Sequence, residues 1–128
     1  MRSFLLNKLV RDKVFVSMQE LGQKITHRQL DDKDFAHELK RKLLEEASEF
    51  DLKNPEKAAE ELADILEVVE ALGKEIGKDF GALREIQAAR QKERGAFAQR
   101  IFIERLDLED NDPWVTYYAK EPERFREV

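Results

Sequence analysis

The sequence predicts an all-α protein: an antiparallel helical bundle of about four helices with a short strand element near the C-terminus. First, apolar residues recur at helical spacing in two long stretches, residues 35–50 and 58–72. Second, Asn, Asp and Gly residues stand where such helices would begin and end. Third, 40% of the 128 residues are charged. So high a charged fraction is typical of amphipathic helices in a single domain that completes a modest core by oligomerising.

The N-terminal part of the chain predicts two helices joined by a connection. Residues 4–7 look extended and lead into a first helix near residues 8–21, which Gly22 ends. An aspartate among residues 31–34 can cap a second helix that runs to about Lys53. The apolar positions that keep helical spacing on this second helix are Phe35, Leu39, Leu43, Ala47 and Phe50.

A clear restart follows at Asn54, because Asn can cap a helix and Pro55 suits its first position. The third helix is predicted over residues 55–72. Since the break before it is short, the second and third helices should be antiparallel neighbours. Its expected apolar face comprises Ala58, Leu62, Ile65, Leu66, Val69 and Leu72.

A fourth helix is predicted over residues 80–94. Gly73 and Gly77 mark the break before it, Asp79 is a plausible cap, and Gly95 closes it.

Beyond that helix, Phe97 is expected in the core. Residues 101–106 are β-branched and aromatic enough to predict a short strand. Residues 1–103 are therefore taken as the main domain, and we expect residues 104–128 to pack on this body or on a partner subunit. This tail carries Trp114, Tyr117 and Tyr118.

Two acidic couplets stand out, Glu46 with Glu49 and Glu61 with Asp64. Each has i, i+3 spacing, so on a helix both carboxylates share one side. Glu46 and Glu61 fall inside the apolar arcs of their helices, and the other two acids lie at the rims. Four carboxylates gathered in a packing face repel one another and resist desolvation. A divalent cation removes that conflict.

The residues alone leave two alternatives to a metal site, a buried salt bridge and a water-filled interface. Lys42 lies near Glu49 on its helix and could pair with it, in competition with a metal. We expect the following acids to be ordinary surface charges that point away from the apolar arcs: Glu45, Glu60, Glu67 and Glu70.

Composition excludes several function classes. The formal net charge of −5 implies no bulk attraction to nucleic acid or to an anionic membrane. Cysteine is absent, so there is no disulfide scaffold or thiolate metal site. No run reaches transmembrane length, and a cytoplasmic protein is expected. The chain has no Walker-type loop and no serine or cysteine nucleophile constellation, so phosphate handling must rest on metal and basic side chains.

Five basic residues are candidates for such phosphate contacts: Lys8, Arg11, Lys13, Arg94 and Arg100. A forked guanidinium suits phosphate oxygens, and lysine supplies a mobile point charge. Surface charge is the alternative for each of them.

Four sequence blocks, in order, resemble MazG-like, phosphoribosyl-ATP pyrophosphohydrolase-like proteins. Residues 7–13 (Asn-Lys-Leu-Val-Arg-Asp-Lys) are similar to the N-terminal signature of that family. Residues 42–50 and 60–72 resemble its two acidic motifs, and residues 92–103 resemble its Arg-Gly-Gly-Phe close. Two departures are Val-Phe in place of the usual Ile-Pro after the first block, and Ala96 in place of the second glycine of the close.

The resemblance implies an all-α nucleoside triphosphate pyrophosphohydrolase that cleaves the α–β phosphate linkage and releases a monophosphate and pyrophosphate. It implies Mg²⁺, with Mn²⁺ as a substitute, held by Glu46, Glu49, Glu61 and Asp64, any one of which could instead be the general base. The metal would neutralise phosphate charge and lower the pKa of the attacking water. It also implies a homodimer or homotetramer whose active site is completed at the subunit interface.

Two other functions stay open. One is hydrolysis of phosphoribosyl-ATP, against which the first sequence block argues mildly. The other is a non-enzymatic helical oligomerisation module, because charged amphipathic helices can simply build a bundle. The position of Glu46 and Glu61 inside apolar arcs speaks against the plain bundle, which would place Leu or Ile there.

Overall fold

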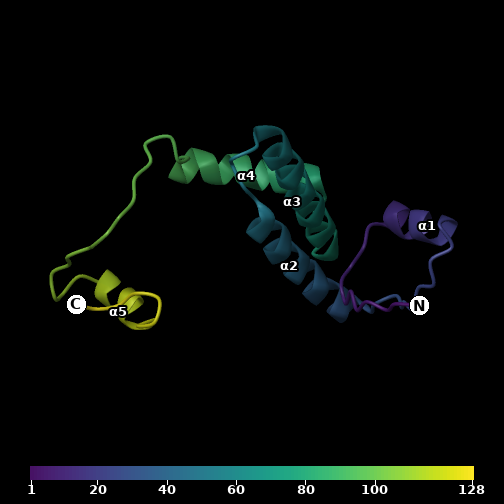
Figure 1. Cartoon of the computed structure of the whole chain (residues 1–128). Helices are drawn as coiled ribbons and strands as arrows, with labels where there is room; N and C mark the ends of the chain where they lie inside the picture. The colour runs from purple at the N-terminus through teal and green to yellow at the C-terminus, as the bar shows by residue number, and fades with distance from the viewer. The chain divides into compact units, whose positions relative to one another are not determined.

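The computed structural model describes residues 1–128 and contains five helices and no strand (Figure 1). Residue contacts divide the chain into two compact units, Met1–Arg94 and Gly95–Val128. The all-α prediction is therefore confirmed. The helices are α1 (Asp12–Glu20), α2 (Asp32–Glu49), α3 (Pro55–Glu75), α4 (Phe80–Arg94) and α5 (Trp114–Ala119).

The first helix begins later than the sequence predicts. Residues 8–11 are not helical, and Arg11 has extended backbone angles at the N-cap of α1. Asn7, just before this stretch, has a φ of 47° in the left-handed region, which a helix interior does not tolerate. Lys8 and Arg11 therefore lie on a non-helical segment.

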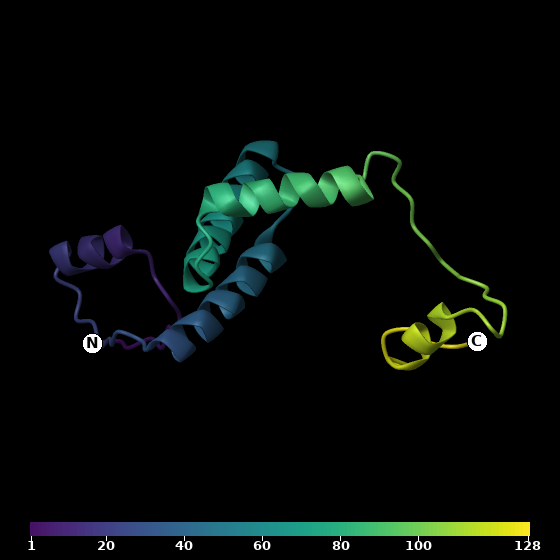
Figure 2. The same ribbon diagram turned by 180° about the vertical axis from the view of Figure 1, so that it is seen from behind.

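Helices α2 and α3 pack side by side and run in opposite directions, as predicted (Figures 1 and 2). The Asp31 side chain caps α2 by accepting from the Asp34 backbone N–H at 2.8 Å. The Asn54 side chain caps α3 by accepting from the Lys57 N–H at 3.3 Å. Helix α2 ends at Glu49, before the predicted end near residue 53, because Phe50 already has extended backbone angles.

Helix α3 continues through Gly73, where the sequence predicted a break. It stops instead at Gly77, whose φ of 74° suits glycine. The Lys78 N–H donates to the Gly73 carbonyl at 2.8 Å, and the Gly77 N–H donates to the Lys74 carbonyl at 3.1 Å. These two bonds form a Schellman motif. The sequence placed the end of this helix too early because Gly73 and Gly77 are both typical of a helix end. Only Gly77 has the left-handed conformation.

Helix α4 matches its predicted range and packs on α3, whereas α1 packs on no other helix. The Asp79 side chain accepts from the Ala82 N–H at 2.8 Å, which confirms the predicted cap. The described packing is therefore a helix hairpin with α4 added, and a four-helix bundle stays a prediction.

The buried apolar core is small and comprises Leu39, Ala58 and Val68. All three lie on α2 or α3. Leu62 and Leu66, which were expected on the packed face of α3, are 48% and 49% exposed. Helix α3 thus buries one side against α2 and leaves a neighbouring apolar side open.

In the second unit, residues 101–106 are neither helix nor strand, so the predicted strand is wrong. A strand needs a neighbouring strand to satisfy its backbone groups, and this chain offers none. Phe97 is 94% exposed, so its predicted core position is wrong as well. Helix α5 was not predicted. Its Tyr118 ring packs on that of Phe125, which follows the helix, with ring centroids 4.9 Å apart in an aromatic cluster.

Candidate functional site

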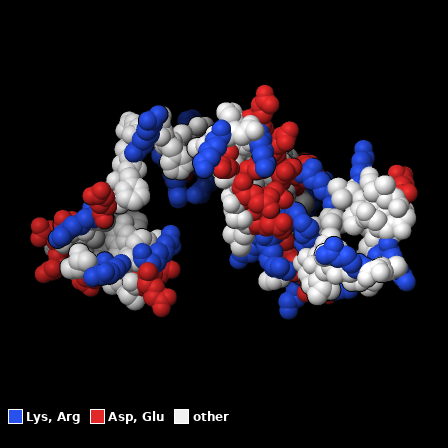
Figure 3. All heavy atoms as spheres, viewed as in Figure 1, with Lys and Arg blue, Asp and Glu red and all other residues white.

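The acidic couplets lie on the two helices of the hairpin, Glu46 and Glu49 on α2 and Glu61 and Asp64 on α3. The Glu46 side chain is 12% exposed and Glu61 is 8% exposed, so both acids lie within the packing face, as their place in the apolar arcs predicts. Glu49 is exposed and Asp64 is half-exposed, in agreement with their positions at the rims. On the face shown in Figure 3, acidic side chains gather over α3 and basic side chains border them.

Glu61 holds the connection between the two helices. Its Oε2 atom accepts a hydrogen bond from the Asp51 backbone N–H at 3.2 Å. Because Asp51 follows the end of α2, this bond ties the start of the connection to the buried side of α3. The other oxygen of Glu61 has no protein donor within hydrogen-bond distance.

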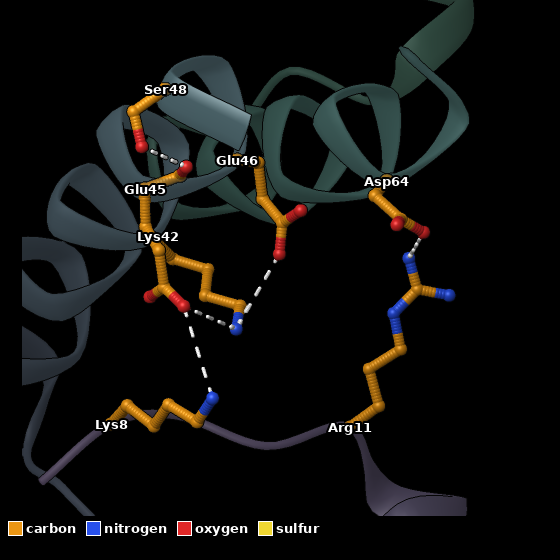
Figure 4. Close-up of polar contacts among 7 residues, drawn as sticks. All are labelled: Lys8, Arg11, Lys42, Glu45, Glu46, Ser48 and Asp64. Atoms are coloured by element: carbon orange, nitrogen blue, oxygen red, sulfur yellow. Dashed lines mark hydrogen bonds and ion pairs between the residues drawn. The ribbon is translucent and has the colours of Figure 1, made fainter. Parts of the chain in front are cut away.

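The non-helical residues 8–11, which we call the basic strap, connect to both helices (Figure 4). The Arg11 Nη2 atom lies 2.9 Å from the Asp64 Oδ1 atom on α3. The Lys8 Nζ atom lies 3.8 Å from the Glu45 Oε1 atom on α2. Two of the predicted phosphate-binding residues therefore reach the region of the couplets, although Arg11 and Asp64 are 53 positions apart.

Lys42 pairs with other acids than predicted. Its Nζ atom lies 3.5 Å from Glu46 Oε1 and 3.8 Å from Glu45 Oε1, whereas the sequence suggested Glu49 (Figure 4). The i, i+3 and i, i+4 positions are neighbours on a helix, and the i, i+7 position is about 10 Å away along the axis. Glu45 was expected to point away from the site, but it lies between Lys8 and Lys42.

A shallow pocket of about 190 Å³ lies between the strap and α2. The Arg41 guanidinium there is held by Glu38, with Nη1 at 2.9 and 2.8 Å from its two carboxylate oxygens. The sequence did not predict the Glu38–Arg41 pair or the contacts of Glu45 with Lys8 and Lys42. The i, i+3 spacing of Glu38 and Arg41 could have predicted their ion pair. The pocket is lined by Lys8, Leu9, Glu38, Arg41, Lys42 and Glu45.

Of the other predicted phosphate contacts, Lys13 and Arg94 are not part of this cluster. Lys13 is exposed on α1, and Arg94 is exposed at the last position of α4. Arg100 is exposed in the second unit, with a φ of 56°. Neither Lys13 nor Arg94 forms an ion pair with the couplets, so a contact of Lys13, Arg94 or Arg100 with substrate rests on the sequence alone.

The donor chemistry of the couplets fits a hard divalent cation, which prefers carboxylate oxygens. Their arrangement fits less well, because no three acids or histidines of the chain are gathered closely enough to hold one ion. Asp64 and Glu46 face Arg11 and Lys42 instead, and Glu61 faces a backbone N–H. In this conformation, protein donors occupy one oxygen of each of these three carboxylates.

Comparison with known proteins gives no match: no protein-family model, no curated protein and no solved structure is similar to the chain at a significant level. The resemblance of the four sequence blocks to MazG-like proteins therefore stays a prediction. No helix of the structure combines the length and the apolar character needed to span a membrane.

Proposed function

We propose that this chain is a divalent-cation-dependent nucleoside triphosphate pyrophosphohydrolase that cleaves the α–β phosphate linkage. The observation that carries the proposal is the position of Glu46 and Glu61, two acids within the packing face of adjacent antiparallel helices. Placing carboxylates there costs free energy of solvation, which a purely structural hairpin would avoid by using Leu or Ile.

The basic strap gives further support. Arg11 and Lys8 lie at the same end of the hairpin as the couplets, so cationic groups and carboxylates share one region (Figure 4). Hydrolysis of a phosphoric anhydride can use both, since acids hold the cation and basic groups bind the phosphate oxygens.

In this proposal Glu46, Glu49, Glu61 and Asp64 hold Mg²⁺ or Mn²⁺, which supplies charge neutralisation and an activated water. Glu49 is the best placed of the four to accept a proton from water, because it is exposed at the rim of the arc. Lys8 and Arg11 orient the phosphates. Phosphoribosyl-ATP is the alternative substrate.

The open apolar side of α3, with Leu62 and Leu66, supports assembly into a homodimer or homotetramer. The same observation favours a second function, a non-enzymatic helical module that only oligomerises. The two functions differ in what they require of the buried acids, because only the enzyme needs their charge.

The deciding experiment measures pyrophosphate released from a panel of nucleoside triphosphates and from phosphoribosyl-ATP, with Mg²⁺ or Mn²⁺ present. Glu46→Gln and Glu61→Gln should each lower kcat at least about a hundredfold, which is about 2.7 kcal/mol of transition-state stabilisation. Both variants should fold, because glutamine keeps the shape and removes a negative charge from the packing face. Glu60→Gln and Glu67→Gln make the same change at exposed positions of α3 and should keep full activity.

Unchanged turnover in Glu46→Gln or in Glu61→Gln would refute the role of that residue. If no compound of the panel releases pyrophosphate and millimolar Mg²⁺ leaves the melting temperature of the wild type unchanged, the result favours the oligomerisation module. A cation that binds only the folded state must raise that temperature.

A further inference from the structure

Residues 101–103 carry large apolar side chains that nothing in the second unit covers. Ile101 and Ile103 are each 74% exposed, and Phe102 is 85% exposed. They lie in an open stretch of chain before α5 that is neither helix nor strand (Figure 1). Because β-branched and aromatic residues favour strands, these three residues have the composition of a strand without its structure.

The backbone of the same three residues is also unpaired within the second unit. None of their N–H or carbonyl groups forms a backbone hydrogen bond there, whereas the Arg100 N–H just before them donates to the Phe97 carbonyl at 3.1 Å. Arg100 has a φ of 56° in the left-handed region, so an extended run begins after it, at Ile101. Free N–H and carbonyl groups beside exposed apolar side chains form an edge at which another strand can pair.

A second copy of the chain is the partner that this segment fits. In an antiparallel pair of identical strands related by a two-fold axis, one residue of each copy lies opposite itself. With Phe102 at the axis, Ile101 lies opposite Ile103 of the second copy, so every apolar residue of the segment meets an apolar residue. The neighbouring symmetric registers lack this match. With Ile103 at the axis Phe102 faces Glu104, and with Ile101 at the axis Phe102 faces Arg100.

The charges at the two ends of the Phe102-centred register are complementary. Arg100 comes opposite Glu104 of the second copy, and the symmetry repeats this contact at the other end. Within the second unit neither of these side chains has an ion-pair partner, whereas Arg105 is already paired with Asp107 at 2.8 Å. Apolar and charged groups of the segment therefore both match a copy of the segment itself, which favours self-pairing over an unrelated strand.

From these observations we infer that residues 101–103 form an antiparallel ladder with the same residues of a second copy, centred on Phe102. The strand that the sequence predicts here then forms between chains, because the missing neighbour is another copy. This surface is separate from the open apolar side of α3, and the inference stands whether or not the chain is an enzyme. The interface is small, and two strands alone are only marginally stable in water, so the association is weak and depends on concentration.

The first test follows hydrogen exchange of the full chain by mass spectrometry, in peptides that contain residues 101–103. Protein is compared at about 5 and about 500 µM, because a small interface associates weakly. The backbone amides of the wild type should exchange at least about threefold more slowly at the higher concentration. Phe102→Lys places two positive charges opposite each other and should abolish this difference. Phe97→Lys makes the same change at a phenylalanine that is 94% exposed and outside the ladder, and it should behave as the wild type.

The second test measures the register. The chain has no cysteine, so Phe102→Cys introduces a single thiol that lies opposite itself, within the Cα separation of about 4.4–6.8 Å that a disulfide spans. Oxidised glutathione should convert this variant into a covalent dimer, because the disulfide traps each encounter. In the same register the two thiols of Leu106→Cys lie eight positions apart along the ladder, about 27 Å, and should not be linked.

The outcomes decide the inference without reference to activity. Slower exchange at high concentration that Phe102→Lys abolishes, with cross-linking of Phe102→Cys and not of Leu106→Cys, supports the ladder. Exchange that does not depend on concentration overturns the inference, and so does equal cross-linking of the two cysteine variants. Because Phe102 is 85% exposed, its replacement should leave folding intact, which far-UV circular dichroism verifies. Release of pyrophosphate tests the proposed function separately.

Discussion

Replacing Gly73 with alanine would place a methyl group where the turn between α3 and α4 has no space. A Cβ atom at this position would lie 2.5 Å from the Lys78 carbonyl oxygen and 2.7 Å from the Leu83 Cδ1 atom. The Leu83 side chain can rotate, but the Lys78 oxygen belongs to the backbone of the Schellman turn. The contact is about 0.9 Å shorter than the 3.4 Å at which ordinary contacts begin, so the turn itself must move.

The change in the free energy of unfolding is the sum of three contributions. Overpacking of this kind costs about 1–3 kcal/mol. Moving the turn weakens the Lys78–Gly73 hydrogen bond, whose loss costs about 1 kcal/mol. Alanine is a better helix former than glycine and returns about 1 kcal/mol. We expect Gly73→Ala to lower the free energy of unfolding by about 1–3 kcal/mol, which is a fall of about 5–20 °C in Tm.

Gly81→Ala is the matched control. Gly81 lies in the first turn of α4, and a Cβ there would meet only the Asp79 Oδ1 atom, at an ordinary distance of 3.5 Å. Without a clash, the reduced entropy of the unfolded chain should stabilise the protein by about 0.4–1 kcal/mol. Urea unfolding followed by circular dichroism at 222 nm, at one protein concentration, measures both variants. Equal or greater stability of Gly73→Ala would refute the packing described for this turn.

Two further predictions concern two helix caps and the aromatic cluster. Asn54→Ala should destabilise the protein by about 0.5–1 kcal/mol. Asp79→Ala should destabilise it by at least as much, because the cap hydrogen bond is 2.8 Å at Asp79 and 3.3 Å at Asn54. Urea unfolding that ranks the two variants in the reverse order would contradict this prediction. Phe125→Ala should reduce the near-ultraviolet circular dichroism of the tyrosines that pack on this ring, whereas Phe102→Ala, at an exposed ring without an aromatic partner, should leave the signal intact.

Much of the hairpin could be predicted from local physics. Asn54 and Asp79 cap the helices that they were expected to cap, and Asp31 is the one of the three candidate aspartates that caps α2. A side-chain oxygen and the N–H three residues later meet when a helix starts at such a residue. Glu46 and Glu61 were placed in the packing face by helical periodicity, and both are largely buried. These features depend on spacing within a few turns of chain.

Predictions that needed a partner element failed or shifted. The strand at residues 101–106 has the right residue types but no strand beside it. Leu62 and Leu66 have the right period but lie on a side of α3 that α2 does not cover. Residue preferences indicate which secondary structure a segment can form, but a neighbouring element is needed to pair with it or to bury its apolar side.

By itself the sequence determined where α2, α3 and α4 lie along the chain and that each helix of the hairpin carries an acid in its apolar arc. Only the tertiary structure decided which cations meet those acids: Arg11 with Asp64, and Lys42 with Glu46 and Glu45. The reason is physical. Capping and periodicity act over a few residues, whereas the Arg11–Asp64 pair depends on how the chain places a non-helical strap against a helix 53 positions away.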